Sequence, residues 1–135
     1  MISPAQYPQP PTLLLAAPAS GSGKTLLTLG LLRAFRDRGV AVGGAKSGPD
    51  YIDPRFHLAA CGRASGNLDA WAMAAGEVRA RARGGLGDAP AELLIVEGAM
   101  GALDGAPPEG KGSAADLAAA LGAPVVMVVD AGRMA

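Results

Sequence analysis

The sequence contains few cysteines, few aromatic residues and no excess of charge of either sign. Its 135 residues include one cysteine and 4% aromatic residues, and 12 basic side chains balance 12 acidic ones. A single cysteine forms no internal disulfide and excludes a cysteine-rich zinc site. A net charge of zero gives no support to a basic surface for nucleic acid or membranes, and no apolar run approaches the roughly 18 residues of a membrane span. We therefore expect a cytoplasmic protein that binds neither nucleic acid nor a membrane.

From residue 12 onward, short apolar runs alternate with segments of helix length. The pattern predicts strands at 12–17, 40–46, 92–97 and 124–130 and helices at 24–38, 54–61, 71–83 and 114–121, the last of them capped by Ser113. Such alternation is typical of an α/β domain in which helices cover both faces of a mainly parallel sheet. Residues 1–11 include four prolines and are expected to form a flexible leader. The last predicted strand ends five residues before the chain does, so we expect either a piece of a longer protein or a small sheet with an open edge.

A glycine-rich segment separates the first predicted strand from the first predicted helix. It consists of Ser20, Gly21, Ser22, Gly23, Lys24 and Thr25. Glycines here let backbone N–H groups turn toward one anion, and the following helix directs its positive dipole end at the same point. Lys24 then supplies a charge for the outer phosphates, and Thr25 supplies a hydroxyl for Mg²⁺. The segment indicates a nucleotide-binding loop, although Pro18 stands where the usual P-loop spacing has glycine. The alternative is a glycine-rich turn with a chance Lys-Thr pair.

The surroundings of this loop disfavour two classes of nucleotide-binding protein. A partition-type ATPase resembling it would carry a second lysine at the position of Ala19. The only lysines are Lys24, Lys46 and Lys111, and none stands in the Asn-Lys-x-Asp or Thr-Lys-x-Asp setting with which GTPases read the base. An ATPase switch module with a P-loop but without ligase chemistry stays open as an alternative.

Charged side chains also stand at the ends of the second and third predicted strands. Lys46 ends one strand and is followed by Asp50 and Asp53, and Glu97 ends the next. In a parallel sheet the loops at the carboxyl ends of the strands line the ligand crevice, so we expect these side chains on the same rim as Lys24. Carboxylates there can hold Mg²⁺ directly or through water, or hold a cationic group. The alternative for Asp50 and Asp53 is that they only cap turns, because Asp-x-x-Asp-Pro is favourable turn chemistry.

Together these motifs resemble the N-terminal ATP-binding domain of the cobyrinic acid a,c-diamide synthase family, which includes the hydrogenobyrinic acid enzymes. The matching segments are 17–25 (APASGSGKT), 46–54 (KSGPDYIDP), 67–69 (NLD), 96–101 (VEGAMG) with 104–105 (DG), 113–118 (SAADLA) and 128–131 (VVDA). In that family Pro18 is normal. The resemblance implies an α/β, three-layer P-loop NTPase-like domain similar to dethiobiotin synthetase. Residues 12–135 would form an incomplete ATP-binding amide-ligase domain.

The resemblance also implies a reaction. It is the ATP-dependent amidation of the a- and c-acetate carboxylates of cobyrinic or hydrogenobyrinic acid, through an acyl phosphate, in cobalamin biosynthesis. Ammonia would come from glutamine, hydrolysed by a C-terminal amidotransferase domain that is not in this chain, because Cys61 lacks the strand-to-helix elbow of such a nucleophile. We therefore expect a corrinoid substrate, ATP and Mg²⁺, a homodimer, and no activity from the fragment alone. Alternatives within the family are amidases that act on a nickel sirohydrochlorin or make cobyric acid.

The matched motifs imply roles for individual residues. Ser20, Gly21, Ser22, Gly23, Lys24 and Thr25 would bind ATP; Lys24, Lys46, Asp50 and Asp53 would serve catalysis; Thr25, Asp50 and Glu97 would hold Mg²⁺; Tyr51 and Asp53 would contact the corrinoid. Asp50 and Asp53 either hold a second metal ion or orient the attacking ammonia. Cys61 is interpreted as a small buried apolar residue and His57 as structural or at the substrate rim. Trp71 is interpreted as a domain-packing anchor rather than a platform for the corrin.

Overall fold

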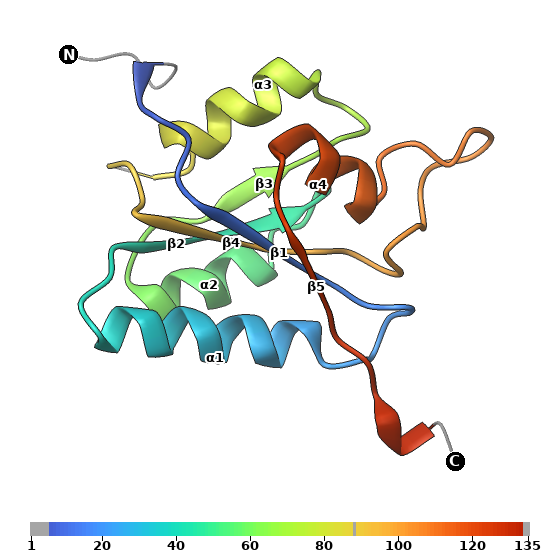
Figure 1. Ribbon diagram of the computed structural model, residues 1–135, viewed down its shortest axis with the longest axis horizontal. Coiled ribbons are helices and arrows are strands. Elements are labelled where there is room, and N and C mark those ends of the chain that lie inside the picture. The colour runs from blue at the N-terminus through green and yellow to red at the C-terminus, as the bar shows by residue number, and fades with distance from the viewer. Residues whose placement is uncertain (1–5, 88, 134–135) are drawn as a thin grey trace.

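Strands and helices alternate along the chain and enclose a central sheet (Figure 1). The computed structural model describes residues 6–87 and 89–133. The strands are β1 (Thr12–Ala16), β2 (Val42–Ser47), β3 (Gly66–Leu68), β4 (Leu93–Glu97) and β5 (Val125–Met127). The helices are α1 (Lys24–Asp37), α2 (Asp53–Cys61), α3 (Ala75–Ala80) and α4 (Ala114–Leu121). A π-helical turn, η2 (Arg81–Gly85), follows α3, and a 3-10 turn, η3 (Ala131–Arg133), follows β5.

The five strands make one sheet in which all neighbours run parallel. Their order is β3-β2-β4-β1-β5. The register places Leu15 of β1 and Lys46 of β2 on either side of the same β4 residue, Glu97. Because the strands are parallel, the loops that follow β1, β2 and β4 leave from one edge of the sheet. The expected α/β fold with a mainly parallel sheet is confirmed, and it is of the P-loop NTPase-like kind.

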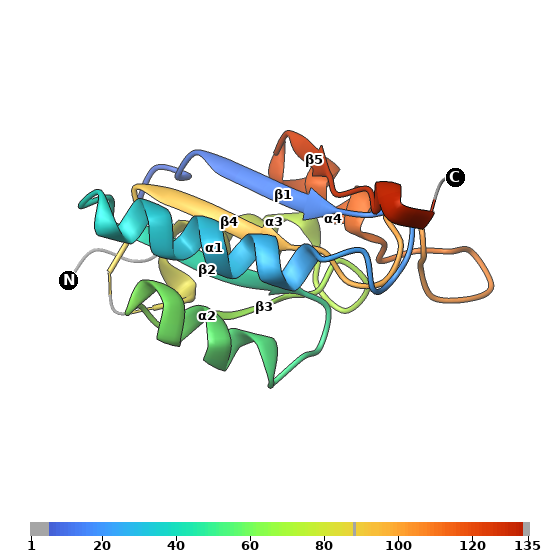
Figure 2. The same cartoon turned by 90° about the horizontal axis from the view of Figure 1, so that it is seen from below.

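Helices cover both faces of this sheet, as the alternation predicts. Helices α1 and α2 lie on one face and α3 and α4 on the other (Figure 2). Neighbouring residues of β1 serve the two layers, because successive side chains of a strand point to opposite faces. Leu15 lies in the cluster that contains Leu32 of α1, whereas Leu14 lies in the cluster that contains Leu117 of α4. The uninterrupted apolar run of β1 is therefore that of a strand buried on both faces.

Several predicted boundaries were wrong. The helix expected from residue 71 begins only at Ala75, because Asp69 Oδ1 accepts hydrogen bonds from the backbone N–H groups of Trp71 and Ala72 and holds them in a turn. The strand expected at 124–130 is formed only over Val125–Met127. The sequence did not predict β3, whose three residues pair with β2.

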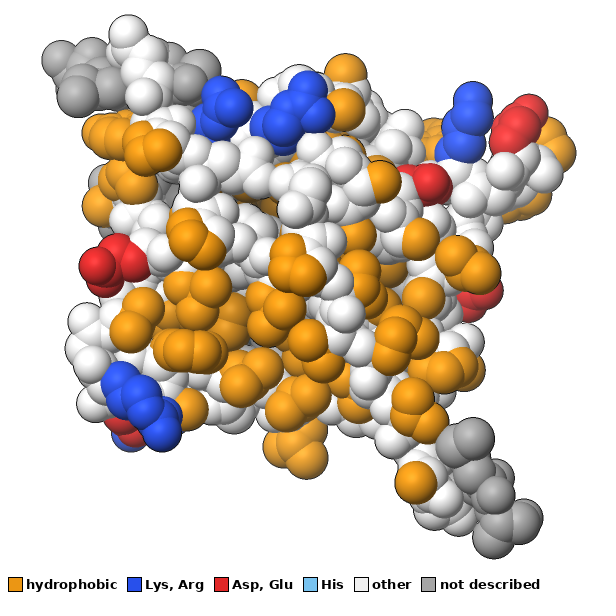
Figure 3. All heavy atoms as spheres, in the orientation of Figure 1, with side chains coloured by type: hydrophobic (Ala, Val, Ile, Leu, Met, Phe, Trp, Pro, Cys, Tyr) orange, Lys and Arg blue, Asp and Glu red, His pale blue; other side chains and the backbone are white. Residues whose placement is uncertain are grey.

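Strand β5 lies at one edge of the sheet, where β1 is its partner among the described strands. Val125, Val126 and Met127 each expose 39 to 46% of their surface. Figure 3 shows apolar side chains gathered on this side of the molecule, over β5, β1 and α1.

None of the helices in the described residues combines the length and apolar character of a membrane span.

The expected flexible leader, residues 1–11, lies partly outside the described residues. In its described part, Gln9 Nε2 donates a hydrogen bond to Leu121 O (2.6 Å), and Pro10 is buried. Leu94 N of β4 donates to Pro11 O (2.9 Å). These contacts join residues 9–11 to the domain, and the flexibility of the leader stays a prediction.

Candidate active site

The predicted P-loop forms a tight turn between β1 and α1. Gly21 and Gly23 have positive φ angles of 79° and 96°, a backbone region that residues with a Cβ rarely adopt. Ser22 Oγ donates to Ala19 O (3.0 Å), and Leu27 N donates to Gly23 O (3.1 Å), so helical bonding begins at Gly23. The first N–H groups of a helix lack acceptors within the helix, and α1 has no acidic residue in its first turn. This end of α1 is therefore suited to an anion.

Lys24 is held by backbone carbonyls. Its Nζ donates to Met100 O (2.7 Å) and to Ala19 O (3.3 Å), and the residue is only 7% exposed. Burial lowers the pKa of Lys24, and repulsion from Lys46 lowers it further. Met100 has a positive φ of 51°, which is uncommon for a residue other than glycine. The loop after β4 thus directs a carbonyl at the P-loop lysine.

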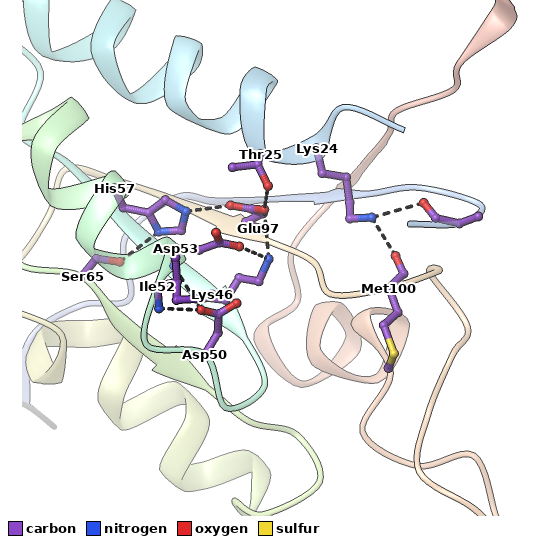
Figure 4. Close-up of polar contacts among 11 residues, drawn as sticks. Lys24, Thr25, Lys46, Asp50, Ile52, Asp53, His57, Ser65, Glu97 and Met100 are labelled. Atoms are coloured by element: carbon purple, nitrogen blue, oxygen red, sulfur yellow. Dashed lines mark hydrogen bonds and ion pairs between the residues drawn. The ribbon is translucent and has the colours of Figure 1, made fainter. Parts of the chain in front are cut away.

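Glu97, at the end of β4, joins three of the surrounding elements (Figure 4). Its Oε1 accepts hydrogen bonds from Thr25 Oγ1 of α1 and from Lys46 Nζ of β2 (2.9 Å). Its Oε2 lies 2.8 Å from His57 Nε2 of α2. Burial would raise the pKa of Glu97, but the hydrogen bonds from His57, Thr25 and Lys46 outweigh it and lower the pKa to about 2. The carboxylate is therefore ionised at neutral pH.

Lys46 bridges two carboxylates. Its Nζ lies 2.6 Å from Asp53 Oδ2 and 2.9 Å from Glu97 Oε1. Burial alone would lower the pKa of Lys46, but the hydrogen bonds and charges of Asp53 and Glu97 raise it. Lys46 is therefore a charged group whose charge is compensated inside the protein.

Asp50 shapes the loop between β2 and α2. Its Oδ1 accepts hydrogen bonds from Ile52 N (2.8 Å) and Asp53 N (3.0 Å), which orders the start of α2. The capping role considered for Asp50 is thus present in the structure. The neighbouring Tyr51 is 85% exposed. Figure 4 places Asp50 beside Lys46, on the side away from Thr25.

Two cavities adjoin Lys46, which lines both of them. The smaller, about 420 Å³, is lined by the P-loop together with Lys46 and Glu97. The larger, about 810 Å³, is lined by Lys46, Asp50 and the loops that carry Trp71 and Lys111. Trp71 is 67% exposed. The structure therefore brings the predicted P-loop and the loop after β2 to one edge of the sheet, with a cavity beside the predicted P-loop and a wide second cavity that both adjoin Lys46.

The residues at this edge suit a magnesium ion that arrives with a nucleotide. Among the described residues, no three His, Cys, Asp or Glu side chains gather into a group that could hold a metal ion by itself. Mg²⁺ commonly keeps several waters and binds through one or two protein oxygens plus substrate phosphates. The Thr25 hydroxyl and the Glu97 carboxylate, which contact each other, supply such oxygens. Lys46 and His57 already form hydrogen bonds with the two oxygens of Glu97. This carboxylate is therefore better suited to accept a hydrogen bond from a metal-bound water than to ligate the ion directly.

Comparison with curated proteins identifies close relatives. The chain is 56% identical over 124 residues to the hydrogenobyrinate a,c-diamide synthase of Rhodobacter capsulatus, a match that covers 90% of this chain and 28% of that protein. It is 52% identical over 122 residues to the synthase of the same name from Rhizobium meliloti, with the same coverage. It is 54% identical over 120 residues to that of Brucella anthropi, covering 89% of this chain and 27% of the relative.

The resemblance to this synthase family is confirmed. The chain spans about 28% of the length of the relatives that it matches. No family model matches the chain.

In a chain that resembles these synthases, the structure gathers most of the predicted residues and adds others. It brings Lys24, Thr25 and Glu97 to the smaller cavity and Asp50 to the larger one, with Lys46 lining both. Sequence reasoning missed the contacts of His57 and Met100. His57 is fully buried, so it is not at the substrate rim. A usable signal was its spacing from Asp53, since residues four apart share one face of a helix. No local signal marked Met100. Cys61 is buried, as predicted.

Proposed function

We propose that this chain is the ATP-binding part of an enzyme that converts carboxylates of a corrinoid into amides in cobalamin biosynthesis. Support for the substrate comes from the relatives, which are named for the a,c-diamide of hydrogenobyrinate. The single observation that carries the proposal is the position of Lys46. It lines both the cavity beside the P-loop and the wide cavity next to it. A ligase that transfers a phosphoryl group from ATP to a second substrate needs two such adjoining spaces, whereas an ATPase switch has no need of the second.

In the proposed complex, ATP binds with its phosphates at the P-loop. The backbone N–H groups of the P-loop and of the start of α1 donate to the phosphate oxygens. The positive φ angles of Gly21 and Gly23 give the turn the backbone shape that this binding needs. Lys24 exchanges its two carbonyl partners for phosphate oxygens. Ser20 and Ser22 contribute further polar groups at the rim. Thr25 would hold Mg²⁺ through its hydroxyl and Glu97 through a metal-bound water, and the ion would supply charge neutralisation at the phosphates.

The corrinoid is proposed to occupy the larger cavity, with an acetate carboxylate directed toward Lys46. A macrocycle with several carboxylates suits a wall that offers the exposed indole of Trp71 and the ammonium group of Lys111. Two-thirds of the surface of Trp71 is exposed, which suits this use and also its interpretation as a domain-packing anchor, and that interpretation stays a prediction. Tyr51, which is also exposed, and Asp53 lie on the loop and helix that follow β2, a few residues after Asp50, which lines this cavity.

The proposed chemistry has two steps. A carboxylate oxygen of the corrinoid attacks the γ-phosphorus of ATP, the bond to the β-phosphate oxygen breaks, and ADP leaves. Ammonia derived from glutamine then attacks the acyl carbon of the acyl phosphate, inorganic phosphate leaves, and a proton passes from nitrogen to a base. Lys24 and Lys46 reduce the repulsion between two anions in the first step. Asp50 and Asp53 are candidates to orient the ammonia in the second. The glutamine-hydrolysing domain is proposed to lie outside this chain, which spans 28% of the relative.

Replacing Lys24 tests this function. Lys24→Ala removes the charge meant for the outer phosphates, and we expect ATP-dependent amidation to fall on the order of 100- to 1000-fold, together with ATP affinity. Arg33→Ala is a matched control, because Arg33 lies on the same helix with its side chain 61% exposed and pairs only with Asp37 in the contacts seen. The assay is amide formation on hydrogenobyrinate by the full-length enzyme that carries this chain, with glutamine or ammonia, alongside calorimetric binding of Mg·ATP. Unchanged amidation by Lys24→Ala would reject the proposed function.

A further inference from the structure

His57 lies outside both cavities of the site but contacts one of its central groups. Its side chain is fully buried, with Nε2 2.8 Å from Glu97 Oε2. On the other side of the ring, Nδ1 lies 3.1 Å from Ser65 Oγ, which donates in turn to Gly44 O (2.8 Å). An ionised carboxylate can only accept hydrogen bonds, so Nε2 is the ring nitrogen that carries hydrogen toward Glu97. The imidazole is thus fixed from both sides.

The sheet provides space for this ring at Gly44. A Cβ on Gly44 would lie 2.9 Å from His57 Cβ and 3.1 Å from His57 Cγ, closer than side chains tolerate. The absence of a side chain on β2 therefore lets α2 bring the imidazole against the strand. His57 follows Asp53 by one helical turn, so α2 presents both residues to the same side. Asp53 contacts Lys46, and His57 contacts Glu97.

The two oxygens of Glu97 have different surroundings. Oε1 faces the smaller cavity, where Thr25 and Lys46 donate to it, and Oε2 faces His57. The terminal torsion of a glutamate is broad, so donors on one oxygen alone leave the plane of the carboxylate free to turn. A donor on Oε2 fixes that plane and keeps Oε1 directed at Thr25.

We propose that His57 is a positioning residue, which fixes the Glu97 carboxylate so that it receives a magnesium-bound water beside Thr25. This inference rests on the proposed function and adds a residue to it. His57 contacts neither nucleotide nor metal, and it acts only through Glu97. Groups that orient the ligands of a metal in this way commonly change metal affinity or activity by about 10- to 100-fold when they are replaced.

A pair of substitutions separates this role from simple core packing. Glutamine places its amide nitrogen near the position of Nε2, and asparagine places its amide nitrogen near that of Nδ1. His57→Gln therefore keeps a donor for Glu97, whereas His57→Asn keeps only a polar group beside Ser65 and no donor for Glu97. Both remove the imidazole and leave a polar side chain in its place. A role in packing alone predicts similar behaviour for the two variants.

The measurement is the dissociation constant of ATP for the protein at increasing Mg²⁺ and again in EDTA. We expect His57→Asn to weaken the magnesium-dependent affinity by about 10- to 100-fold, with the affinity in EDTA unchanged, and His57→Gln to restore most of the loss. Equal shifts in the two variants, or no shift in His57→Asn, would overturn the proposal. If thermal melting shows that both variants are unfolded, Ser65→Ala replaces them, because it frees the far side of the ring and keeps the imidazole. A magnesium-dependent loss in Ser65→Ala then supports the role, and its absence refutes it.

The same titration separates this inference from the proposed function. A wild-type protein that shows no magnesium-dependent ATP binding would reject the function itself. Loss of binding in Lys24→Ala combined with normal magnesium dependence in His57→Asn would reject only the role of His57.

Discussion

Glu97→Gln should remove a large, pH-dependent contribution to the stability of the fold. Glu97 is buried and accepts hydrogen bonds from Thr25, Lys46 and His57. The substitution keeps the shape of the side chain but replaces an oxygen by an NH₂ group. Whichever way the amide is turned, this group faces a donor, either His57 Nε2 or Lys46 Nζ. The variant also leaves Lys46 with Asp53 as its single carboxylate partner.

The magnitude follows from the pKa of Glu97. Its pKa is lowered from 4.5 to about 2 in the folded protein, which corresponds to about 3 kcal/mol of stabilisation. Because the folded pKa lies below the unfolded one, the stabilisation is fully present well above pH 4.5. It is lost as the pH falls toward 2. By pH 3.5, roughly 1 kcal/mol of it should be gone.

Urea unfolding of wild type and Glu97→Gln between pH 7 and 3.5 measures this contribution directly. The other carboxylates are the same in both proteins, so the difference between their free energies of unfolding reports on Glu97 together with its partners Lys46 and His57. We expect a difference of about 3 kcal/mol or more at pH 7 that narrows as the pH falls below 4.5. Glu77→Gln, at an exposed position on α3, serves as the control and should behave as wild type at every pH. A difference that stays constant with pH would refute the assignment of the hydrogen-bonded, ionised state to Glu97.

Two further substitutions test other parts of the site. Asp50→Asn keeps an oxygen that can accept hydrogen bonds from Ile52 N and Asp53 N, so α2 should remain intact. If the charge of Asp50 serves the chemistry, steady-state assays of the full-length enzyme should show reduced amidation with normal ATP binding. Normal amidation would limit Asp50 to capping. Gly98→Ala would place a Cβ 2.7 Å from Leu15 O, so it should lower the free energy of unfolding by about 1–3 kcal/mol in urea titrations, and an unchanged value would contradict this packing.

Local chemistry was enough to predict some features from the sequence. Ser113 was predicted as a helix cap, and it forms a capping box with Asp116, whose backbone N–H donates to Ser113 Oγ (3.1 Å) while its carboxylate accepts from Ser113 N. The tight turn before α1 was equally predictable, because Gly21 and Gly23 permit its backbone angles; its use as a P-loop stays a prediction. Both features depend on residues within a few positions of one another.

Features that depend on distant partners could not be predicted. Strand β3 has no apolar pattern and exists because β2 offers it a free edge, with Lys46 and Asn67 in register. The contact between His57 and Glu97 joins residues 40 positions apart, and only the fold reveals it. The hydrogen bond from Lys24 to Met100 O spans 76 positions. Each pairing is decided by the order of the strands, which the hydrophobic pattern does not determine.

The two lysines of the site differ in a way that supports separate roles for them. Among the described residues, Lys24 has no carboxylate within ion-pair distance, and its ammonium group is held by two carbonyls. Lys46 instead lies between Asp53 and Glu97, which compensate its charge. An incoming polyanion is therefore attracted first to Lys24. There it displaces only two neutral carbonyl groups and pairs with a positive charge that no carboxylate of the described residues holds in an ion pair. Lys46 can bind a second anion only when Asp53 or Glu97 binds another partner instead of Lys46. For Glu97, that partner would be a magnesium-bound water beside Thr25. In the proposed enzyme, nucleotide binding therefore precedes, and prepares, the use of Lys46 on the substrate carboxylate.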